Sequence, residues 1–387
     1  MEGGPVRIVY ASNYPWSGLR RRAQHLALAL ARAPETARVL YVNPREEALR
    51  FRGRPRRTAG AETPAAGPAV VTPLRWVPFS GRVGALARWN AAAEIRRIER
   101  AAGGPFVLLA NAVGGHMEEI VAGLAARRPF LFDWTDDFTR FEAYRRDPGA
   151  LRRLEDRIAR YLRLARGVIA VNARLAAAAR AAGADPVVVP NGADLEGMAR
   201  ALEPLPVPAA LADLGDRPVL GYAGVFTALR IDADLLAGAL DRLDGWTLAV
   251  LGDRDESLAA RFRGRKDVRF LPPVPAEELP AWYRRFTVCA IPHLDNEHTR
   301  GNDPLKLYEA LAAGRPVVTT PVAGVEPFRE TVEIAADPEG FARAAERARA
   351  GDGPEAARAR RAAVRPCSWT IRAEKVLERV LPLAVEE

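Results

Sequence analysis

Cysteines, lysines and long apolar runs are scarce in this sequence. The 387 residues include two cysteines, Cys289 and Cys367, which are too few for a disulfide-stabilised scaffold and are typical of a reducing compartment. Cys289 lies within an apolar run and is expected to be a small core residue. No apolar run approaches the ~20 residues that span a bilayer, and the N-terminus lacks the features of a signal peptide. We therefore expect a cytoplasmic protein without a transmembrane helix, disulfide or zinc site.

The composition is that of a folded protein with more than one domain. Hydrophobic residues make up 49% and charged residues 27% of the chain, which excludes a disordered chain. The length exceeds the size of a comfortable single core. The net charge of +9 would suit a nucleic acid or an anionic membrane. No helix-turn-helix, zinc or RNP-like signature accompanies this charge, so we expect no nucleic-acid partner.

Most of the excess charge lies in residues 45–100, which contain 12 arginines and 5 glutamates. Aromatic residues such as Trp76 and Trp89 are interspersed with these arginines. This composition suits a surface that rests on anionic lipid headgroups, as in a peripheral protein on the inner face of the membrane. The alternative is an arginine-rich loop produced by compositional bias.

Short β-branched runs alternate with loops and helical stretches along the chain. VRIVYAS precedes GLRRRAQHLALALARA, and PVLGYAGV precedes DADLLAGALDRL. This alternation predicts parallel sheets with crossover helices, and strands that are apolar on both faces belong to sheets covered on both sides. We expect an N-terminal domain at 1–200, a linker at 201–216 and a C-terminal domain at 217–366. A last helix at 367–387 is expected to pack back on the N-terminal domain.

Only three of the 57 basic residues are lysines, and Lys306 lies at the expected start of a helix. This helix is predicted from Pro304 to Ala313, with Asp303 as its N-cap and Lys306 at its third position. The third position favours Glu, because a helix N-terminus carries about half a positive charge. A lysine there suits an arriving phosphate or carboxylate, and Glu309 suits a ribose diol. Alternatively, Lys306 is a solvated residue that pairs with Glu309.

Several segments resemble those of GT-B glycosyltransferases and follow in the same order. They are GLRRRAQHLALALA, RVLYVNP, VVVPNGADL, RPVLGYAGVF, WTLAVLGD and NEHTRGNDPLKLYEALAAGRPVVTTPVAGVE. The resemblance covers most of the chain outside residues 45–100. It implies an α/β fold of two doubly wound, Rossmann-like domains facing a central cleft. It also implies sugar transfer from a UDP-, GDP- or dTDP-sugar in the C-terminal domain to an acceptor in the N-terminal domain, with no further cofactor.

The resemblance implies roles for individual residues of the C-terminal domain. Lys306 would contact the donor phosphate or a sugar acid, and Glu309 would contact the ribose. Gly224 matches a loop beside the pyrophosphate, where a missing side chain lets backbone amides approach. Arg230 would assist, and His293 lies at a strand end beside this loop. The donor-binding residues we expect are Gly224, Arg230, His293, Lys306, Leu307 and Glu309.

Asp133, Asp136 and Asp137 follow a predicted strand of the N-terminal domain. In an inverting transfer, a carboxylate deprotonates the acceptor hydroxyl. The stretch is similar to a segment of the glucuronosyltransferases of xanthan assembly, whose catalytic Asp matches Asp136. Asp136 is therefore the expected base, with Asp137 next, and the alternative is that these residues cap the following helix. GT-B enzymes generally neutralise the diphosphate with helix ends and basic side chains, so no metal is expected.

Many retaining enzymes of this fold carry two Glu separated by seven residues, and this signature is incomplete in the sequence. With Glu309 as the second Glu, the first would fall at or next to Gly301, so Glu297 or Asp303 would have to take its place. An inverting outcome is therefore favoured. His116 follows two glycines and is a further catalytic candidate.

Gly18 and Arg20 lie in the first strand-to-helix loop, which faces the cleft in this fold. They would meet an acceptor phosphate, or they form a solvated helix start. The acceptor would be a glycan, a glycolipid or a small molecule, and the basic segment favours a lipid-linked acceptor, as in polysaccharide or glycolipid assembly. Two alternatives are a nucleotide-sugar epimerase of the same fold and a non-catalytic binding protein.

Overall fold

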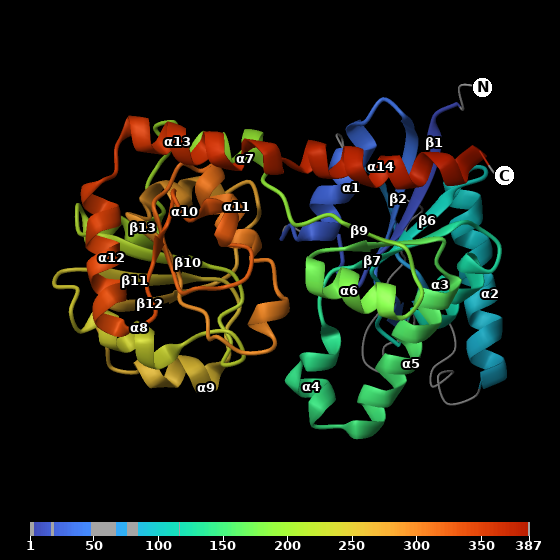
Figure 1. The fold of residues 1–387 in the computed structure, drawn as a ribbon, viewed down its shortest axis with the longest axis horizontal. Coiled ribbons are helices and arrows are strands. Elements are labelled where there is room, and N and C mark those ends of the chain that lie inside the picture. Colours follow the sequence, from blue (N-terminus) through green and yellow to red (C-terminus); the bar gives the residue numbers. More distant parts are fainter. Residues whose placement is uncertain (1–3, 17–18, 48–66, 76–83, 116, 386–387) are drawn as a thin grey trace. The chain divides into compact units, whose positions relative to one another are not determined.

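The computed structural model describes residues 4–16, 19–47, 67–75, 84–115 and 117–385. The chain divides into two compact units, which are coloured by sequence position in Figure 1. Unit 1 contains residues 1–190 and 369–387, and unit 2 contains residues 191–368. Within the described residues, no helix combines the length and the apolar character that crossing a membrane requires.

Unit 1 is built on a parallel sheet of seven strands in the order β4-β2-β1-β6-β7-β8-β9. The strands are β1 (Val6–Ala11), β2 (Thr36–Val42), β4 (Ala69–Val71), β6 (Val107–Ala110), β7 (Phe130–Trp134), β8 (Gly167–Ala170) and β9 (Pro186–Val188). A separate two-stranded sheet pairs β3 (Glu46–Glu47) with β5 (Leu74–Arg75). The order reverses between β1 and β6, as in other doubly wound sheets.

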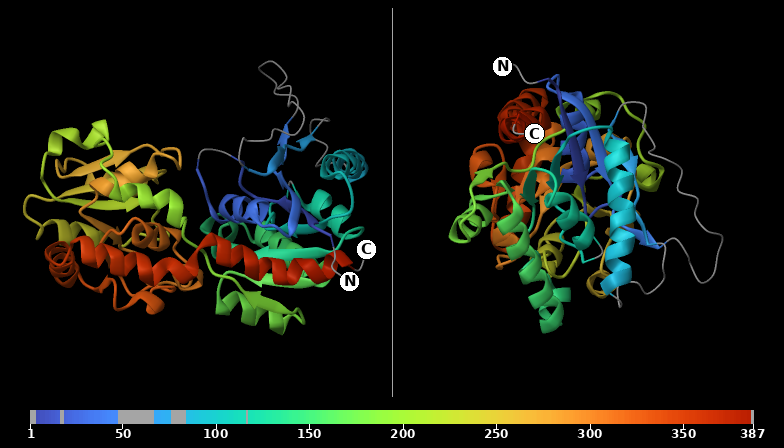
Figure 2. Two further views of the ribbon diagram at one scale, coloured as in Figure 1. Left: turned by 90° about the horizontal axis from the view of Figure 1, so that it is seen from above. Right: turned by 90° about the vertical axis from the view of Figure 1, so that its right-hand side faces the viewer.

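Helices cover both faces of the sheet of unit 1. They are α1 (Arg22–Arg32), α2 (Gly84–Ala102), α3 (Glu118–Ala125), α4 (Glu142–Arg145), α5 (Pro148–Leu164), α6 (Ala173–Ala181) and α14 (Trp369–Val385), with the short η2 (Phe138–Arg140). Figure 2 shows α2 and α14 on opposite sides of β1 and β2. Helix α14 packs on α1, where the rings of His25 and Trp369 stack with their centres 5.3 Å apart.

Unit 2 repeats this plan with a parallel sheet of six strands in the order β12-β11-β10-β13-β14-β15. The strands are β10 (Val219–Ala223), β11 (Thr247–Leu251), β12 (Val268–Leu271), β13 (Val288–Ile291), β14 (Val317–Thr319) and β15 (Glu333–Ile334). The α-helices are α7 (Leu195–Ala199), α8 (Ala233–Leu240), α9 (Glu256–Ala259), α10 (Leu279–Arg285), α11 (Leu305–Ala312), α12 (Pro338–Ala350) and α13 (Pro354–Val364). The 3-10 helices are η3 (Arg200–Leu202), η4 (Ala209–Leu214), η5 (Ala260–Phe262), η6 (Thr299–Gly301), η7 (Glu326–Phe328) and η8 (Arg365–Cys367).

The inner strands of unit 2, β10, β11, β13 and β14, are buried on both faces, as their composition predicts. In β11, Leu248 and Val250 join one apolar cluster, whereas Ala249 and Leu251 join another. Successive side chains of a strand point to opposite faces, so each cluster lies between the sheet and one layer of helices. The α/β fold predicted from the alternating pattern is therefore confirmed.

The sequence order reverses between β10 and β13 in unit 2. From β10 the chain continues outward through β11 and β12, and then returns to the other side of β10 as β13. Ligands of open α/β sheets bind outside the carboxyl ends of the strands at such a reversal. The loops after β10, β11 and β13 are therefore the place to look for a site in unit 2.

The structure differs from the expected boundaries at two places. Residues 191–216 belong to unit 2, and Leu211 and Leu214 of η4 are buried in its core, so this segment is not an exposed linker. Helix α11 begins at Leu305 with Pro304 as its N-cap residue, which places Lys306 at the second helical position. The predicted Asp303 cap was wrong, because the Asp303 carboxylate is used in other contacts.

Candidate functional site

Two glycines after β10 and β11 bring their loops into direct contact in unit 2. Gly224 has φ +132° and Gly252 has φ +135°, a region that residues with a side chain rarely adopt. A Cβ atom on Gly252 would lie 2.4 Å from the Gly224 carbonyl oxygen, so only glycine fits there. The Gly224 N–H donates to the carbonyl of Leu251 over 2.9 Å. The exposed Gly224 therefore presents bare backbone at the carboxyl edge of the sheet.

Lys306 lies across this glycine loop. Its Nζ is 4.8 Å from the centre of the Tyr222 ring, within the range of a cation–π contact. A Cβ atom on Gly224 would lie 3.3 Å from Lys306 Cε and 3.5 Å from Nζ. The side chain is half-buried. The structure thus brings Lys306 and Gly224 together, as expected, and adds Tyr222 beneath the ammonium.

The surroundings of Lys306 disfavour its positive charge. Burial and the nearby Arg230 guanidinium lower its pKa to about 7, and the Glu309 carboxylate only partly opposes them. No carboxylate of the described residues lies within 4.0 Å of Lys306, so the alternative of a surface ion pair with Glu309 is not what the structure shows. Two cations near the N-terminus of α11 repel each other, and an anion between them would relieve this repulsion.

Glu309 lies one turn further along α11 than Lys306. Its Oε2 accepts a hydrogen bond of 2.8 Å from the Tyr283 hydroxyl. Burial raises the pKa of Glu309, whereas the Tyr283 hydroxyl and the Lys306 charge oppose this rise. In the part of the chain that the structure describes, no hydrogen bond is found to Oε1. Glu309 is therefore held in place by one oxygen and retains an acceptor for a ligand hydroxyl.

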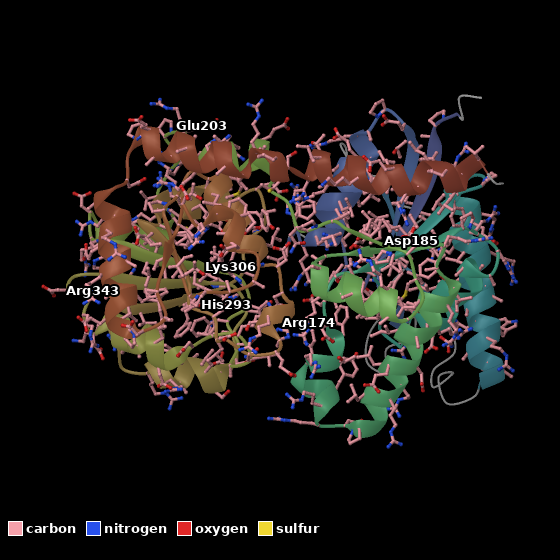
Figure 3. All side chains as sticks on the ribbon, in the orientation of Figure 1. Arg174, Asp185, Glu203, His293, Lys306 and Arg343 are labelled. Carbon is pink, nitrogen blue, oxygen red and sulfur yellow. The ribbon has the colours of Figure 1, made fainter. Side chains whose placement is uncertain are left out.

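His293 follows β13 and lies beside Lys306 within unit 2, where Figure 3 labels both residues. The imidazole is 3% exposed, and its Nε2 is buried without a hydrogen-bond partner among the described residues. Burial, followed by the charges of Lys306 and Arg230, lowers the pKa of His293 well below its ordinary value. A neutral imidazole therefore lines the site.

Arg230 is oriented by a histidine that sequence reasoning missed. Its Nε donates to His298 Nε2 over 3.1 Å, and His298 is buried. No local motif marks His298, because its contact is with a residue in a different loop. Tyr222 and Tyr283 were missed because, in the sequence, both look like ordinary core residues.

Two other expectations about this segment need correction. The Leu307 side chain is fully buried in the core, and its N–H donates to the Pro304 carbonyl, so Leu307 supports α11 and does not face a ligand. Asp303 accepts hydrogen bonds from the Asn191 N–H at 2.5 Å and the Tyr308 hydroxyl at 2.9 Å. Asp303 therefore fixes the loop before α11 and is poorly placed to replace the first Glu of a retaining enzyme.

The three aspartates in and after β7 of unit 1 have different surroundings, and Asp133, which was predicted to follow this strand, lies within it. Asp133 is fully buried and receives bonds from the Arg22 guanidinium, with Arg22 Nη2 at 2.9 Å, and from the Tyr10 hydroxyl at 2.5 Å. Burial and the Asp133 charge raise the pKa of Tyr10 well above its ordinary value. Arg22 also donates to the Pro190 carbonyl over 3.1 Å. Asp133 is therefore the centre of a structural network in unit 1.

Asp136 and Asp137 lie beyond the carboxyl end of β7 and are half-buried. The Asp136 carbonyl accepts a bond of 3.1 Å from the Trp134 indole N–H, which fixes the backbone there. Asp137 accepts from the Thr139 hydroxyl and lies 3.4 Å from Arg140. Asp137 precedes η2, but its side chain makes no capping bond to a backbone N–H of that helix.

The remaining candidates are found in loops of unit 1. Arg20 is half-buried in the loop between β1 and α1, at the same edge of the parallel sheet as the loop after β7. Gly18 and His116 lie outside the described residues. Among the residues that are described, no group of three or more His, Cys, Asp or Glu side chains is arranged to hold a metal ion.

Comparison with known proteins shows the fold and one family match. Residues 217–350 match the family described as "Glycosyl transferases group 1". No curated protein sequence matches the chain significantly. Solved structures match it over nearly its full length.

Three of these structures show the extent of the similarity. A sucrose-phosphate synthase from Thermosynechococcus elongatus has 18% identity and a TM-score of 0.70, covering 99% of this chain and 100% of its own. An alpha,alpha-trehalose 6-phosphate synthase from Burkholderia multivorans has 14% identity and a TM-score of 0.67, covering 98% and 99%. Anabaena HepE in complex with UDP and glucose has 17% identity and a TM-score of 0.65, covering 96% and 98%. The chain has the GT-B fold of these structures, and residues 217–350 match the group 1 glycosyl transferase family.

Proposed function

We propose that the protein transfers a sugar from a nucleotide diphosphate sugar to an acceptor hydroxyl. The observation that carries this proposal is the pair of cations, Lys306 and Arg230, beside the bare backbone of Gly224. Both lie at the carboxyl edge of the unit 2 sheet, where its strand order reverses. A diphosphate suits this arrangement, because it brings negative charge to two cations and a helix N-terminus. The group 1 glycosyl transferase domain supports the same reading.

The donor would be bound through three kinds of contact. Lys306 and Arg230 would neutralise the diphosphate, and the Gly224 backbone would approach it closely because no side chain intervenes. Glu309, held by Tyr283 through one oxygen, would accept hydrogen bonds from the ribose diol. The buried His293 Nε2 is a further polar atom for the sugar or phosphate. HepE, which has the same fold, has been solved with UDP-glucose, and this supports a UDP-linked donor.

We further propose an inverting transfer with Asp136 as the base and Asp137 as the second candidate. Asp136 would take the proton of the acceptor hydroxyl while the oxygen attacks the anomeric carbon. The bond from the anomeric carbon to the diphosphate would break, and the nucleoside diphosphate would leave with its charge held by Lys306 and Arg230. Charge neutralisation by these side chains and the α11 N-terminus would make the transfer independent of a metal ion.

The acceptor is proposed to be lipid-linked, as in polysaccharide or glycolipid assembly, with the protein bound peripherally to an anionic membrane. Leu86 and Trp89 are 40% and 58% exposed on the first turns of α2, and the exposed Arg88 lies between them in sequence. Apolar side chains next to a cation suit a lipid interface. Arg20 would contact an acceptor phosphate.

Donor identity and stereochemistry can be tested together. Titration calorimetry with UDP, GDP and dTDP should give binding of one nucleotide that weakens at least tenfold in Lys306→Ala. Arg174→Ala, an exposed change in unit 1, is the matched control and should bind normally. Proton NMR of the product should show a transferred sugar with inverted anomeric configuration. Binding of none of these nucleotides, or equal binding by Lys306→Ala, would contradict the proposed donor site.

The membrane contact has its own test. Sedimentation with anionic liposomes at low salt should retain the wild-type protein and release a Leu86→Ser/Trp89→Ser variant. Equal retention of both proteins would show that α2 makes no such contact. Neutral liposomes provide the control for apolar adsorption alone.

A further inference from the structure

A pocket of about 360 Å³ lies at the opposite edge of the unit 2 sheet from the donor site. Its walls are the segment 205–207, Ala281 and three arginines, Arg284, Arg285 and Arg315. Arg284 and Arg285 end α10 just before β13, and Arg315 lies just before β14. These arginines are therefore at the amino ends of strands whose carboxyl ends face the donor site. A β-strand rises about 3.3 Å per residue, so the length of these strands separates the two sites by on the order of 15 Å.

The three arginines have few bonds within the protein. Arg284 Nη1 lies 3.5 Å from the Ala201 carbonyl, and Arg285 Nη2 donates to the carbonyls of Gly215 and Arg217 over 2.9 and 3.0 Å. Arg315 Nε is buried and has no hydrogen-bond partner among the described residues. Within the ranges that the structure describes, no carboxylate lies within 4.0 Å of any of the three guanidinium groups.

Many other arginines of unit 2 do have carboxylate partners. The pairs are Arg261–Asp234, Arg265–Asp267, Arg269–Asp213, Arg300–Asp295, Arg343–Glu339, Arg347–Glu333 and Arg360–Asp352. An arginine-rich composition alone therefore does not explain three guanidinium groups without carboxylates around one pocket. Arg230, at the donor site, likewise bonds to a histidine and not to a carboxylate.

The positive charge of Arg285 at the pocket is also partly shielded from water. Burial lowers the pKa of Arg285, and the more distant Asp216 only partly compensates. Guanidinium groups hold phosphate through paired N–H donors, and their charge is stabilised when an anion replaces the lost water. Leu205, Pro206 and Val207 form an apolar wall beside them. The volume lies within the range of about 300 to 1,000 Å³ that is typical of small-molecule sites.

We propose that this pocket binds a small phosphate-bearing molecule at a site separate from the donor site. Its phosphate would lie between Arg284, Arg285 and Arg315, and its carbon portion would pack against residues 205–207. The site is formed entirely by unit 2. An apolar wall beside a group of cations favours a phosphate ester over a bare inorganic ion.

The test separates the two phosphate sites by mutation. Titration calorimetry with pyrophosphate and with glycerol 3-phosphate is done in a Lys306→Ala background, which removes the lysine of the donor site. Adding Arg284→Gln and Arg315→Gln removes two cations of the pocket. Arg285 is left in place because its two backbone bonds hold neighbouring loops together. Arg343→Gln with Arg347→Gln is the matched control, because it removes the same charge from α12 of unit 2, where Figure 3 labels Arg343.

We expect glycerol 3-phosphate to bind the Lys306→Ala protein. The two pocket changes should weaken this binding at least tenfold, and the control changes in α12 should leave it unaltered. Equal binding with and without the pocket changes would overturn the proposal, as would equal weakening in the control. Should the combined variant fail to fold, Arg284→Gln alone serves, because this exposed residue has a single weak bond. It should weaken binding at least threefold, and unchanged binding would overturn the proposal.

A second arm identifies the source of the phosphate. Vesicles containing phosphatidic acid are sedimented with the same variants. Binding of soluble glycerol 3-phosphate that the pocket changes weaken identifies a soluble ligand. Retention on vesicles alone, lost with the pocket changes, identifies a lipid headgroup. The proposal would be overturned if the protein showed neither the binding of soluble glycerol 3-phosphate nor the retention on vesicles.

Discussion

Donor affinity should depend on pH through Lys306. In the free protein, burial and Arg230 lower the pKa of this lysine to about 7. A diphosphate beside Nζ stabilises the charged form, so the pKa of Lys306 in the complex should return towards its ordinary value of about 10. The protonated form binds the donor, so the affinity is highest below pH 7 and falls as the pH rises through about 7.

The size of this effect follows from the titration of one group. With a pKa of about 7, the protonated fraction falls from roughly 0.9 at pH 6 to roughly 0.1 at pH 8. Affinity should therefore drop about tenfold over this range, or about 1.4 kcal/mol. At pH 7, binding should take up about half a proton per donor molecule.

Neighbouring groups must be separated from Lys306 in this experiment. Burial lowers the pKa of His293 well below its ordinary value, so His293 titrates at a lower pH than an ordinary histidine. Burial raises the pKa of Glu309, so Glu309→Gln is included. It should keep a pH dependence with its midpoint at a lower pH than in the wild type, because the Glu309 carboxylate raises the pKa of Lys306. Lys306→Arg should remove it, because arginine does not titrate in this range.

The assay is titration calorimetry with the intact nucleotide diphosphate sugar, whose phosphates are both esterified and do not titrate from pH 6 to 8. Repeating it in buffers with different ionisation enthalpies gives the number of protons taken up. An affinity that stays constant from pH 6 to 8 would refute the argument. The same pH dependence in Lys306→Arg as in the wild type would also refute it, since another group would then be responsible.

Three further predictions concern the glycine loop, the base and the buried network. Gly252→Ala should weaken donor binding at least tenfold in calorimetry, because its Cβ would lie 2.4 Å from the Gly224 oxygen. The control is Gly264→Ala, whose Cβ would have nothing within 4 Å, so it tests the effect of a positive φ alone. Asp136→Asn should lower the turnover number about 10²- to 10⁴-fold while donor affinity stays constant. If Asp137→Asn causes this loss and Asp136→Asn does not, Asp137 is the base. Arg22→Leu should lower the free energy of unfolding by about 3–5 kcal/mol in urea, because it leaves the Asp133 charge buried and unpaired. Arg22→Leu/Asp133→Leu should recover part of this loss, and no recovery would argue against the ion pair.

The fold was predictable because its sequence signal is local and repeated. Strands such as β11 carry apolar residues at every position after the first, and only a sheet covered on both faces buries them all. The end of α11 was predictable too, since Gly314 has φ +71° just after the helix. Its start was not, because Asp303 bonds to the Asn191 N–H, which is remote in sequence.

The donor site could be predicted only in part. The rarity of lysine drew attention to Lys306 and to Glu309 on the same helix, and the resemblance to a family added Gly224 and Arg230. The partners that set their chemistry, Tyr283 and His298, come from other loops, and no spacing rule connects them. The resemblance separated Asp136 from its neighbours in the sequence, whereas the structural role of Asp133 is shown only by its contact with Arg22.

The division of the chain has a consequence for biosynthesis. Unit 1 is assembled from two stretches that are far apart in sequence, whereas unit 2 is one continuous stretch between them. A ribosome synthesises residues 191–368 before Trp369, so α1 lacks α14 and the stacking partner of His25 while unit 2 is being made. The face of α1 that α14 covers therefore stays open through the synthesis of a whole further domain.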